Sequence, residues 1–150
     1  MPDKLTNIGT TIAVSTTLPA TENVAGYGAL TFTEVLGVGS IPEFGGESEV
    51  LTYVDVKDGV TQKAHGGRDF GGGTLSYRII EADTGQGILE DADDNQTTLA
   101  FELTRSTGLI EYFQGIVTSS RTSEASSGNT YTRNSAIQAS TAIIKDASGV

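Results

Sequence analysis

Apolar and polar residues alternate along most of this chain with the two-residue period of β-strands. Residues 97–104 are the clearest case. Leu99, Phe101 and Leu103 share one face there, and the intervening positions are mostly polar. Repeating this search along the chain predicts six strands, at residues 29–35, 49–56, 74–80, 97–104, 109–118 and 134–145.

One segment departs from the β pattern. Within residues 83–94, Ile88, Leu89 and Ala92 recur at helical spacing, and Asp83 precedes them as a candidate N-cap. We therefore expect one short amphipathic helix. Residues 105–108 contain a glycine and join two predicted strands, which indicates a hairpin.

A long stretch between two predicted strands has no apolar periodicity. Residues 55–73 are rich in glycine and charge, and connections of this length inside a small domain are usually functional. We expect residues 1–11 and 146–150 to be free ends and residues 121–129 to be a second flexible loop. The candidate contact residues of the long loop are Lys57, Asp58, Lys63, His65, Arg68, Asp69 and Phe70.

Composition supports a single, mainly β domain. The chain has 150 residues, the usual size of one domain. Its 34 Ser and Thr and 19 Gly, against only 3 Pro, favour strands and tight turns over helices. There is no cysteine, so thiolate metal sites are excluded.

Charge narrows the choice of partners. Nine Lys and Arg against nineteen Asp and Glu give a formal charge of −10. Tight binding to nucleic acid or to an anionic membrane is disfavoured, because such binding needs a basic surface that displaces counterions. No apolar run is long enough to span a membrane, and the first residues do not have the pattern of an export signal.

The candidate chemical motifs are all incomplete. Residues 91–96 with Glu102 approach the pattern of a calcium-binding loop, but Gln96 replaces the required glycine and Glu102 lies in a predicted strand. The glycine runs near His65 are not accompanied by a nucleophile elbow or a phosphate-binding motif. We expect no enzymatic activity and no cofactor.

Two stretches near the start of the chain carry a family resemblance. Residues 18–35, LPATENVAGYGALTFTEV, and residues 41–47, IPEFGGE, resemble the opening of major tail tube proteins of long, non-contractile-tailed bacteriophages. The later order of a long loop, a glycine-rich return, a short helix and closing strands also fits. The resemblance covers residues 18–144.

This resemblance implies a fold and an assembly. The fold would be a β-sandwich or split barrel with one short flanking helix and a long extended loop. Six subunits would form a ring, and stacked rings would form a virion tail tube that delivers DNA to the host, after assembly in the host cytoplasm. The DNA would be in the lumen only transiently, and no membrane would be involved. The expected partners are other copies of the chain and the tape measure, terminator and distal tail proteins.

The resemblance also assigns roles to parts of this chain. Residues 55–73 would reach an adjacent subunit or ring, and residues 1–17 would form an arm that makes further contacts. Polar residues on the strand faces would line the lumen. Because the chain is acidic, the wall of the lumen would be negative and would not retain duplex DNA. The candidate lumen-facing acids are Glu34, Glu49, Asp55 and Glu102.

Two alternatives remain open at this point. The chain could be a small β-sandwich binding or decoration module that uses the acidic turn at residues 91–95 with calcium. An enzyme working with two carboxylates is a third reading, which nothing in the sequence singles out.

Overall fold

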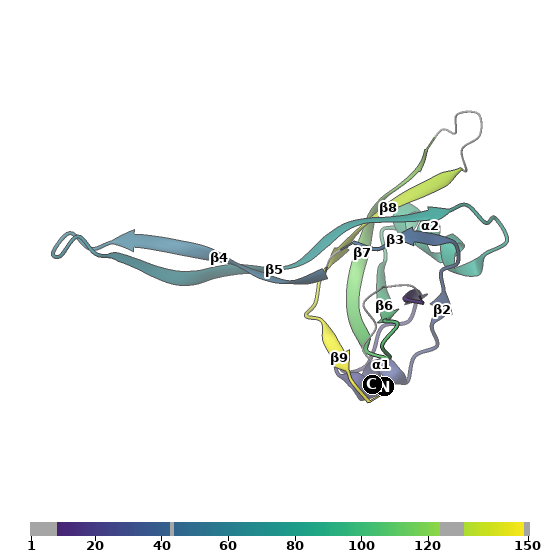
Figure 1. Ribbon diagram of the computed structural model, residues 1–150, viewed down its shortest axis with the longest axis horizontal. Coiled ribbons are helices and arrows are strands. Elements are labelled where there is room, and N and C mark those ends of the chain that lie inside the picture. Colours follow the sequence, from purple (N-terminus) through teal and green to yellow (C-terminus); the bar gives the residue numbers. More distant parts are fainter. Residues whose placement is uncertain (1–8, 43, 124–130, 149–150) are drawn as a thin grey trace.

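The computed structural model describes residues 9–42, 44–123 and 131–148, and within them shows an antiparallel sheet and two helices (Figure 1). In chain order the elements are β1 (Thr11–Ser15), α1 (Val24–Gly28), β2 (Thr33–Glu34), β3 (Val38–Ser40), β4 (Phe44–Val54), β5 (Thr61–Arg78), α2 (Thr84–Asn95), β6 (Thr98–Thr104), β7 (Ile110–Ser123), β8 (Thr132–Ala139) and β9 (Ile144–Asp146).

The sheet curls into a split barrel. Its order is β2-β1-β6-β7-β8-β5-β3, with β4 paired to β5 and β9 paired to β7 outside this path. The two ends of that order, β2 and β3, follow each other in sequence across residues 35–37. Beside this connection, the Arg78 amide donates a hydrogen bond to the Gly37 carbonyl oxygen. The connection brings the two ends of the sheet together. The strands and their order confirm the predicted mainly β fold.

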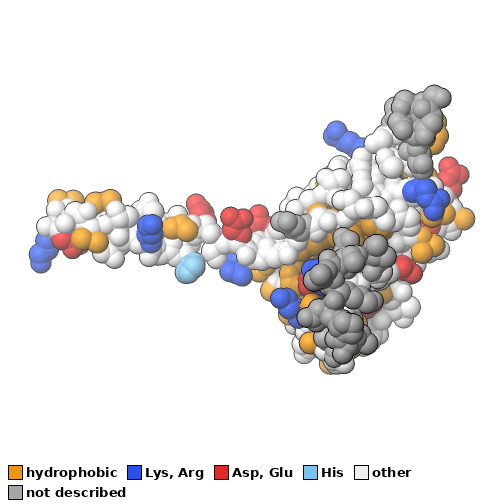
Figure 2. Space-filling model, in the orientation of Figure 1, with side chains coloured by type: hydrophobic (Ala, Val, Ile, Leu, Met, Phe, Trp, Pro, Cys, Tyr) orange, Lys and Arg blue, Asp and Glu red, His pale blue; other side chains and the backbone are white. Residues whose placement is uncertain are grey.

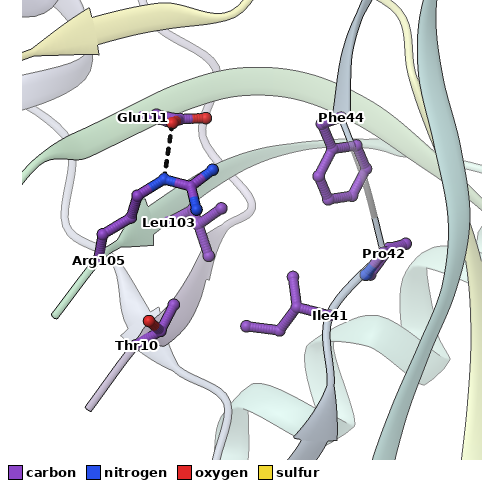
Figure 3. A pocket seen from close by; sticks show the side chains of 7 residues that line it. All are labelled: Thr10, Ile41, Pro42, Phe44, Leu103, Arg105 and Glu111. Atoms are coloured by element: carbon purple, nitrogen blue, oxygen red, sulfur yellow. Dashed lines mark hydrogen bonds and ion pairs between the residues drawn. The ribbon is translucent and has the colours of Figure 1, made fainter. Parts of the chain in front are cut away.

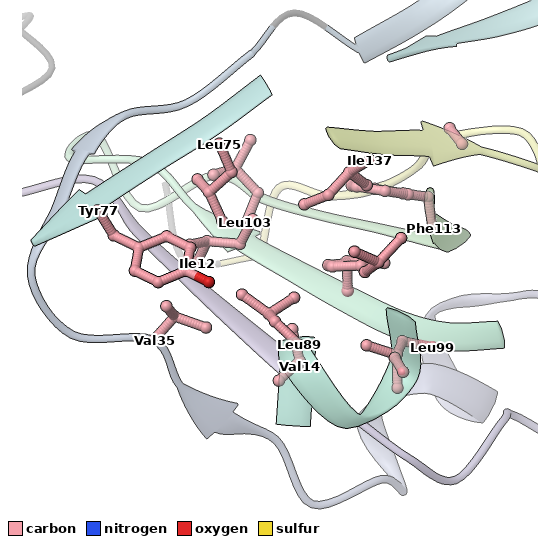
Figure 4. Packing of buried hydrophobic residues seen from close by; sticks show 14 residues of the cluster. Ile12, Val14, Val35, Leu75, Tyr77, Leu89, Leu99, Leu103, Phe113 and Ile137 are labelled. Carbon is pink, nitrogen blue, oxygen red and sulfur yellow. The ribbon is translucent and has the colours of Figure 1, made fainter. Parts of the chain in front are cut away.

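The main core lies inside this curl and is closed by α2. Residues of β1, β5, β6, β7 and β8 pack there with Leu89 and Ala92 of the helix (Figure 4). Phe101 and Phe113 stack with ring centroids 5.0 Å apart. Burying each such large side chain contributes about 1.5–3 kcal/mol, so this cluster supplies most of the driving force for folding.

A smaller cluster lies on the opposite face of the sheet. There Tyr27 of α1 stacks on Tyr112 of β7 with ring centroids 5.2 Å apart, and Ala100 is buried beside them. The Asn23 side chain caps α1 by accepting a hydrogen bond from the Gly26 amide at 2.7 Å. The short helix therefore covers part of the outer face of the barrel.

Helix α2 is fixed across the split by one buried side chain. The side-chain amide nitrogen of Gln86, Nε2, donates hydrogen bonds to the carbonyl oxygens of Leu36 at 2.7 Å and Arg78 at 2.8 Å. Its side-chain oxygen accepts one from the Ile80 amide at 2.9 Å. The Asp83 side chain caps the helix, as predicted, by accepting a hydrogen bond from the backbone amide of Gln86 at 3.1 Å.

Several predicted boundaries are wrong. Residues 55–73 are not a long loop: only residues 55–60 connect two strands, and β5 runs from Thr61 through the glycines to Arg78. Residues 1–17 are not a free arm throughout, because β1 is an inner strand of the sheet between β2 and β6. Residues 1–8 lie outside the described residues, as do residues 124–130 of the second predicted loop.

Other elements differ in extent. The strand expected at residues 29–35 is reduced to the two residues of β2, since α1 and its C-terminal turn precede it. The strand expected at residues 134–145 is split into β8 and β9, so residue 146 belongs to a strand and not to a free tail. Helix α2 is not the only helix of the described residues. None of the described helices has the length and apolar character needed to cross a lipid bilayer.

Candidate assembly surface

A two-stranded ribbon projects far from the barrel. It consists of β4 and the part of β5 up to Gly71, and we call residues 44–71 the arm (Figure 1). Within the described residues, β4 pairs with no strand other than β5, and β5 pairs with β8 only from Gly72 onward. Both long edges of the arm are therefore open. An isolated two-stranded ribbon is marginally stable in water, so the arm has the character of an element completed by a partner.

The base of the arm is fastened to the barrel by aromatic packing. The rings of Phe44 and Phe113 have centroids 4.4 Å apart, and Phe113 belongs to the main core. Phe70 is half-buried against the same core. The Arg68 guanidinium donates a hydrogen bond to Ser48 Oγ at 3.0 Å and lies 5.8 Å from the centroid of the Phe70 ring. These contacts fix the direction in which the arm leaves the barrel.

Glycines are required where β5 passes from the arm into the barrel. Gly71 has a φ of +89°, a conformation that side chains disfavour. A Cβ on Gly72 would lie 2.5 Å from the Ile137 carbonyl oxygen, and one on Gly73 would lie 2.6 Å from Pro42 Cβ. The glycine run is thus a closely packed crossing and not a flexible hinge.

The tip of the arm is a compact turn. Asp55 Oδ1 accepts a hydrogen bond from the Lys57 amide, and Asp58 Oδ1 accepts one from the Val60 amide, each at 2.9 Å. Gly59, with a φ of +67°, closes the turn. Both tip carboxylates are therefore engaged by the arm's own backbone.

Large apolar side chains are exposed along the part of the arm farthest from the barrel, residues 50–65, which we call the outer arm and which includes the tip. Figure 2 shows them together with the basic side chains of the arm. Surface residues of a single chain rarely gather so many exposed aliphatic and aromatic groups, and such patches mark interaction sites. The exposed fractions are Val50 59%, Leu51 52%, Tyr53 69%, Val54 55%, Val56 96% and Val60 51%.

The residues predicted for the long loop all lie on the arm, in three places. Lys57 and Asp58 are in the turn, Lys63 and His65 are exposed on the outer part of β5, and the remainder are near the base. Phe70 packs against the core of its own subunit and is not available as an outward contact. The sequence search missed the exposed apolar residues, although residues 49–56 carry apolar groups on both faces, which a strand with one buried face does not need.

The four predicted lumen-facing acids fall into two separate pairs. Glu34 and Glu102 both pair with Ala13 of β1 and lie on the outer face of the barrel. Glu49 and Asp55 are on the arm. The structure therefore does not bring the four together on one surface.

The carboxyl of Glu102 has a shifted pKa. Burial raises the pKa of its carboxyl above the ordinary value, and the hydrogen bond with the Tyr112 side chain partly opposes this. Burial also raises the pKa of Tyr112, and the negative charges of Glu102 and Asp146 add to the effect. A half-buried, hydrogen-bonded carboxylate presents less charge to its surroundings than an exposed one.

The near match to a calcium-binding loop does not form such a loop. Asp91, Asp93 and Asp94 lie on the last turns of α2, Gln96 ends the helix in a left-handed conformation, and Glu102 lies in β6. In the part of the chain that the structure describes, no three His, Cys, Asp or Glu side chains are grouped as metal ligands. No finding supports the calcium-dependent module.

A cavity of about 350 Å³ opens beside the base of the arm (Figure 3). Ile41, Pro42 and Phe44 line one side, and an ion pair between Arg105 Nε and Glu111 Oε1, 2.8 Å long, lines the other. The charges of Arg105 and Glu111 are paired with each other. Apart from these two residues and Thr10, the side chains that line the cavity are apolar.

Comparison with known proteins identifies the fold. No model of a known protein family matches the sequence, and no curated protein matches it either. Among the solved structures that match the fold, two have a TM-score of 0.65. One is the SPP1 tail tube, with 14% identity over 91% of this chain and 76% of the other. The second is a chain of the anti-feeding prophage baseplate, with 6% identity over 97% of both chains.

These matches place the chain in a structural class. Its fold is that of phage tail tube-type proteins, as the resemblance in the sequence predicted. At such low identities the likeness establishes the fold, and the role of this chain has to be argued from its own surfaces.

Proposed function

We propose that this chain is a structural, non-enzymatic virion protein: six copies form a ring, and stacked rings form a phage tail tube through which DNA reaches the host. The observation that carries the proposal is the arm, which extends well beyond the barrel and exposes apolar side chains out to its tip. The apolar side chains need cover that a lone subunit does not provide, and a repeating assembly provides it from identical copies.

The fold supports the same role. Its solved neighbours are named as a tail tube and a baseplate, both of which are tail structures. We propose that the arm reaches an adjacent subunit or ring, as expected for residues 55–73. The other expected partners are the tape measure, terminator and distal tail proteins.

For the lumen we propose Glu34 and Glu102. They lie on the outer face of the barrel, opposite the main core, where a wall surface can form. Glu49 and Asp55 are on the arm, which we assign to contacts between subunits. DNA would pass without adhering, because an acidic wall releases no counterions from phosphate.

Electron microscopy of the purified chain tests the assembly. We expect tubes to form as the protein concentration is raised, with sixfold symmetry in end-on views. A different rotational symmetry would reject the hexamer and leave the tube. A chain that stays monomeric at millimolar concentration, and is missing from purified tails, would reject the function.

A further inference from the structure

One segment on the outer face of the barrel is attached by a single buried side chain. Residues 16–32 connect β1 to β2 and contain α1, and we call them the strap (Figure 1). Tyr27 is the one buried residue of the strap. Its half-buried residues are Pro19, Gly26, Leu30 and Phe32. The rest of the strap is exposed, so little apolar area holds it in place.

Hydrogen bonds also do little to fasten the strap to the strands beneath it. The backbone amides of Tyr27, Ala29 and Leu30 donate to carbonyl oxygens of the strap itself. Where the strap leaves β1, Ser15 and Thr17 exchange two hydrogen bonds. Across the described residues, the other hydrogen bond between strap and barrel is the one that Gln114 Nε2 donates to Glu22 Oε1. It is 3.4 Å long, near the limit for such a bond.

Helix α1 has little stability of its own. It has five residues, two of them glycine, and helices this short do not persist without tertiary contacts. Gly26 does not tolerate a better helix former, because a Cβ there would overlap the carbonyl oxygen of Thr21. The cap supplied by Asn23 satisfies one amide. The helix therefore depends on the burial of Tyr27 to remain on the barrel.

This anchor carries a cost. The ring of Tyr27 stacks on Tyr112, but its hydroxyl is buried and has no hydrogen-bond partner among the described residues. A buried hydroxyl without a partner has lost its hydrogen bonds to water, which offsets much of the gain from burying the ring. Tyr77 in the main core differs, because its hydroxyl lies 2.9 Å from Ser135 Oγ in a hydrogen bond. The closed position of the strap is therefore only weakly favoured.

We propose that the strap is a lid, which opens and closes over Tyr112 and Ala100 while the barrel stays folded. In the open state water hydrates the Tyr27 hydroxyl, and an aromatic part of the outer face becomes accessible. Tyr27 belongs to the small outer cluster and not to the main core, so its release leaves the main core packed. The inference concerns the single subunit and holds whether or not the chain forms tubes.

Nitration of tyrosine measures the opening. Tyr27 and Tyr77 are 0% and 1% exposed, so the closed structure shields both from a reagent. Global unfolding exposes the two alike, whereas opening of the strap exposes Tyr27 alone. We expect tetranitromethane, added to dilute monomeric protein, to nitrate Tyr27 at least tenfold faster than Tyr77, as read by peptide mass spectrometry. A smaller difference would overturn the proposal.

A covalent lock provides the control for this measurement. The natural chain has no cysteine, so E22C and Q114C, placed where two side chains meet, can be bridged specifically by a short bismaleimide. Bridging should lower the nitration rate of Tyr27 to that of Tyr77. The same double variant treated with N-ethylmaleimide should keep the fast rate. If the bridged protein is nitrated at Tyr27 as fast as the unbridged one, the reagent reaches Tyr27 without movement of the strap, and the lid is wrong.

The two tyrosines also make a matched pair for stability. Y77F removes a paired hydroxyl and should lower the melting temperature by several degrees, because Ser135 loses its partner. Y27F removes an unpaired hydroxyl and should have a melting temperature equal to or above that of the wild type. A fall in the melting temperature of Y27F would show that water pairs the hydroxyl in the closed state, and the physical reason for the strap to open would be lost.

Discussion

Gln86 shows how much of this fold depends on one side chain. The residue is 2% exposed, and its side-chain amide pairs with three backbone groups, at Leu36, Arg78 and Ile80. Leu36 lies in the connection between β2 and β3, and Arg78 and Ile80 lie at the end of β5. The side chain therefore ties helix α2 both to this connection and to the end of β5.

Replacing Gln86 by Ala should destabilise the subunit by about 3 kcal/mol, because buried carbonyl and amide groups lose their partners at about 1–3 kcal/mol each. Chemical denaturation measures this. The control is G87A on the same helix, where a Cβ meets nothing within 4 Å. It should instead stabilise the helix by about 0.5–1 kcal/mol. Equal stability of Q86A and the wild type would show that water replaces the amide.

Glu102 should give the subunit an unusual dependence on pH. Burial raises the pKa of its carboxyl in the folded state above the ordinary value of 4.5. A raised pKa means that the folded state binds the proton more tightly, so this group favours folding below pH 4.5 and loses that contribution as the pH rises through the folded-state value. Its charged form opposes folding at neutral pH.

The variant E102Q should therefore be more stable than the wild type at pH 7, by at most about 1 kcal/mol because solvent screens a partly exposed carboxyl. Thermal unfolding between pH 4 and pH 7 measures the difference, which should disappear at the acidic end. A stabilisation of E102Q that is the same at pH 4 and pH 7 would point to packing and not to charge.

Among the elements, the arm is the one whose removal should leave the rest intact. Its outer part touches no residue of the main core, while Phe44 and Phe70 at the base do. The Ser48↔Arg68 pair is a natural place to close a shorter hairpin. Joining these two residues by Asn-Gly in place of residues 49–67 uses the two-residue turn that hairpins prefer.

We expect this shortened chain to fold with a melting temperature within a few degrees of the wild type and to form no tubes. Circular dichroism and electron microscopy of the same preparation measure both. A larger deletion that also removes Phe70 is the contrasting variant and should lower stability. Tubes of normal length from the shortened chain would show that the arm is dispensable for assembly.

The elements that have one buried face were predicted correctly from the sequence. The elements that have no single buried face were not predicted. Strand β6 and helix α2 bury Leu99, Phe101 and Leu89 on one side, which imposes a readable period. In the single subunit both faces of the outer arm are exposed to water. The strands there are therefore under no requirement to alternate apolar and polar residues, and residues 61–71 show no such alternation, so the strand was not predicted. Helix α1 was missed because its five residues include two glycines, and it depends on the Asn23 cap and the burial of Tyr27.

The candidate site was predictable in position but not in composition. Charged residues led to the right segment, since Lys57, Lys63 and His65 are exposed on the arm. The apolar residues beside them were not predicted as contact residues, because a sequence alone does not distinguish a strand buried in its own domain from one that is covered by another subunit. The inner strand β1 could have been predicted, because Ile12 and Val14 alternate with smaller residues and both are fully buried. The expectation of a free arm at residues 1–17 overlooked this pattern.

At the scale of the whole molecule, the charge of −10 has to be compatible with close packing of many copies. Like charges oppose assembly at low ionic strength, and salt screens them over about 10 Å at 0.1 M. The arm carries five acids against three Lys and Arg, a net charge of −2 in 28 residues, and the rest of the chain carries −8 in 122 residues, so the charge per residue is about equal. Screening by salt, and not the composition of the arm, therefore reduces this conflict.

The same charge predicts how a finished tube treats DNA. Binding of duplex needs Lys and Arg that displace counterions, and an acidic wall offers few. We expect purified tubes to leave double-stranded DNA in the supernatant when the two are sedimented together at physiological salt. The variant E34K, which adds a basic group at an exposed position of the proposed lumen, should retain short duplexes, and this retention should fall as salt is raised. If wild-type tubes carry DNA down with a steep dependence on salt, basic side chains must line the accessible surface, and the acidic wall is not the reason that DNA can pass.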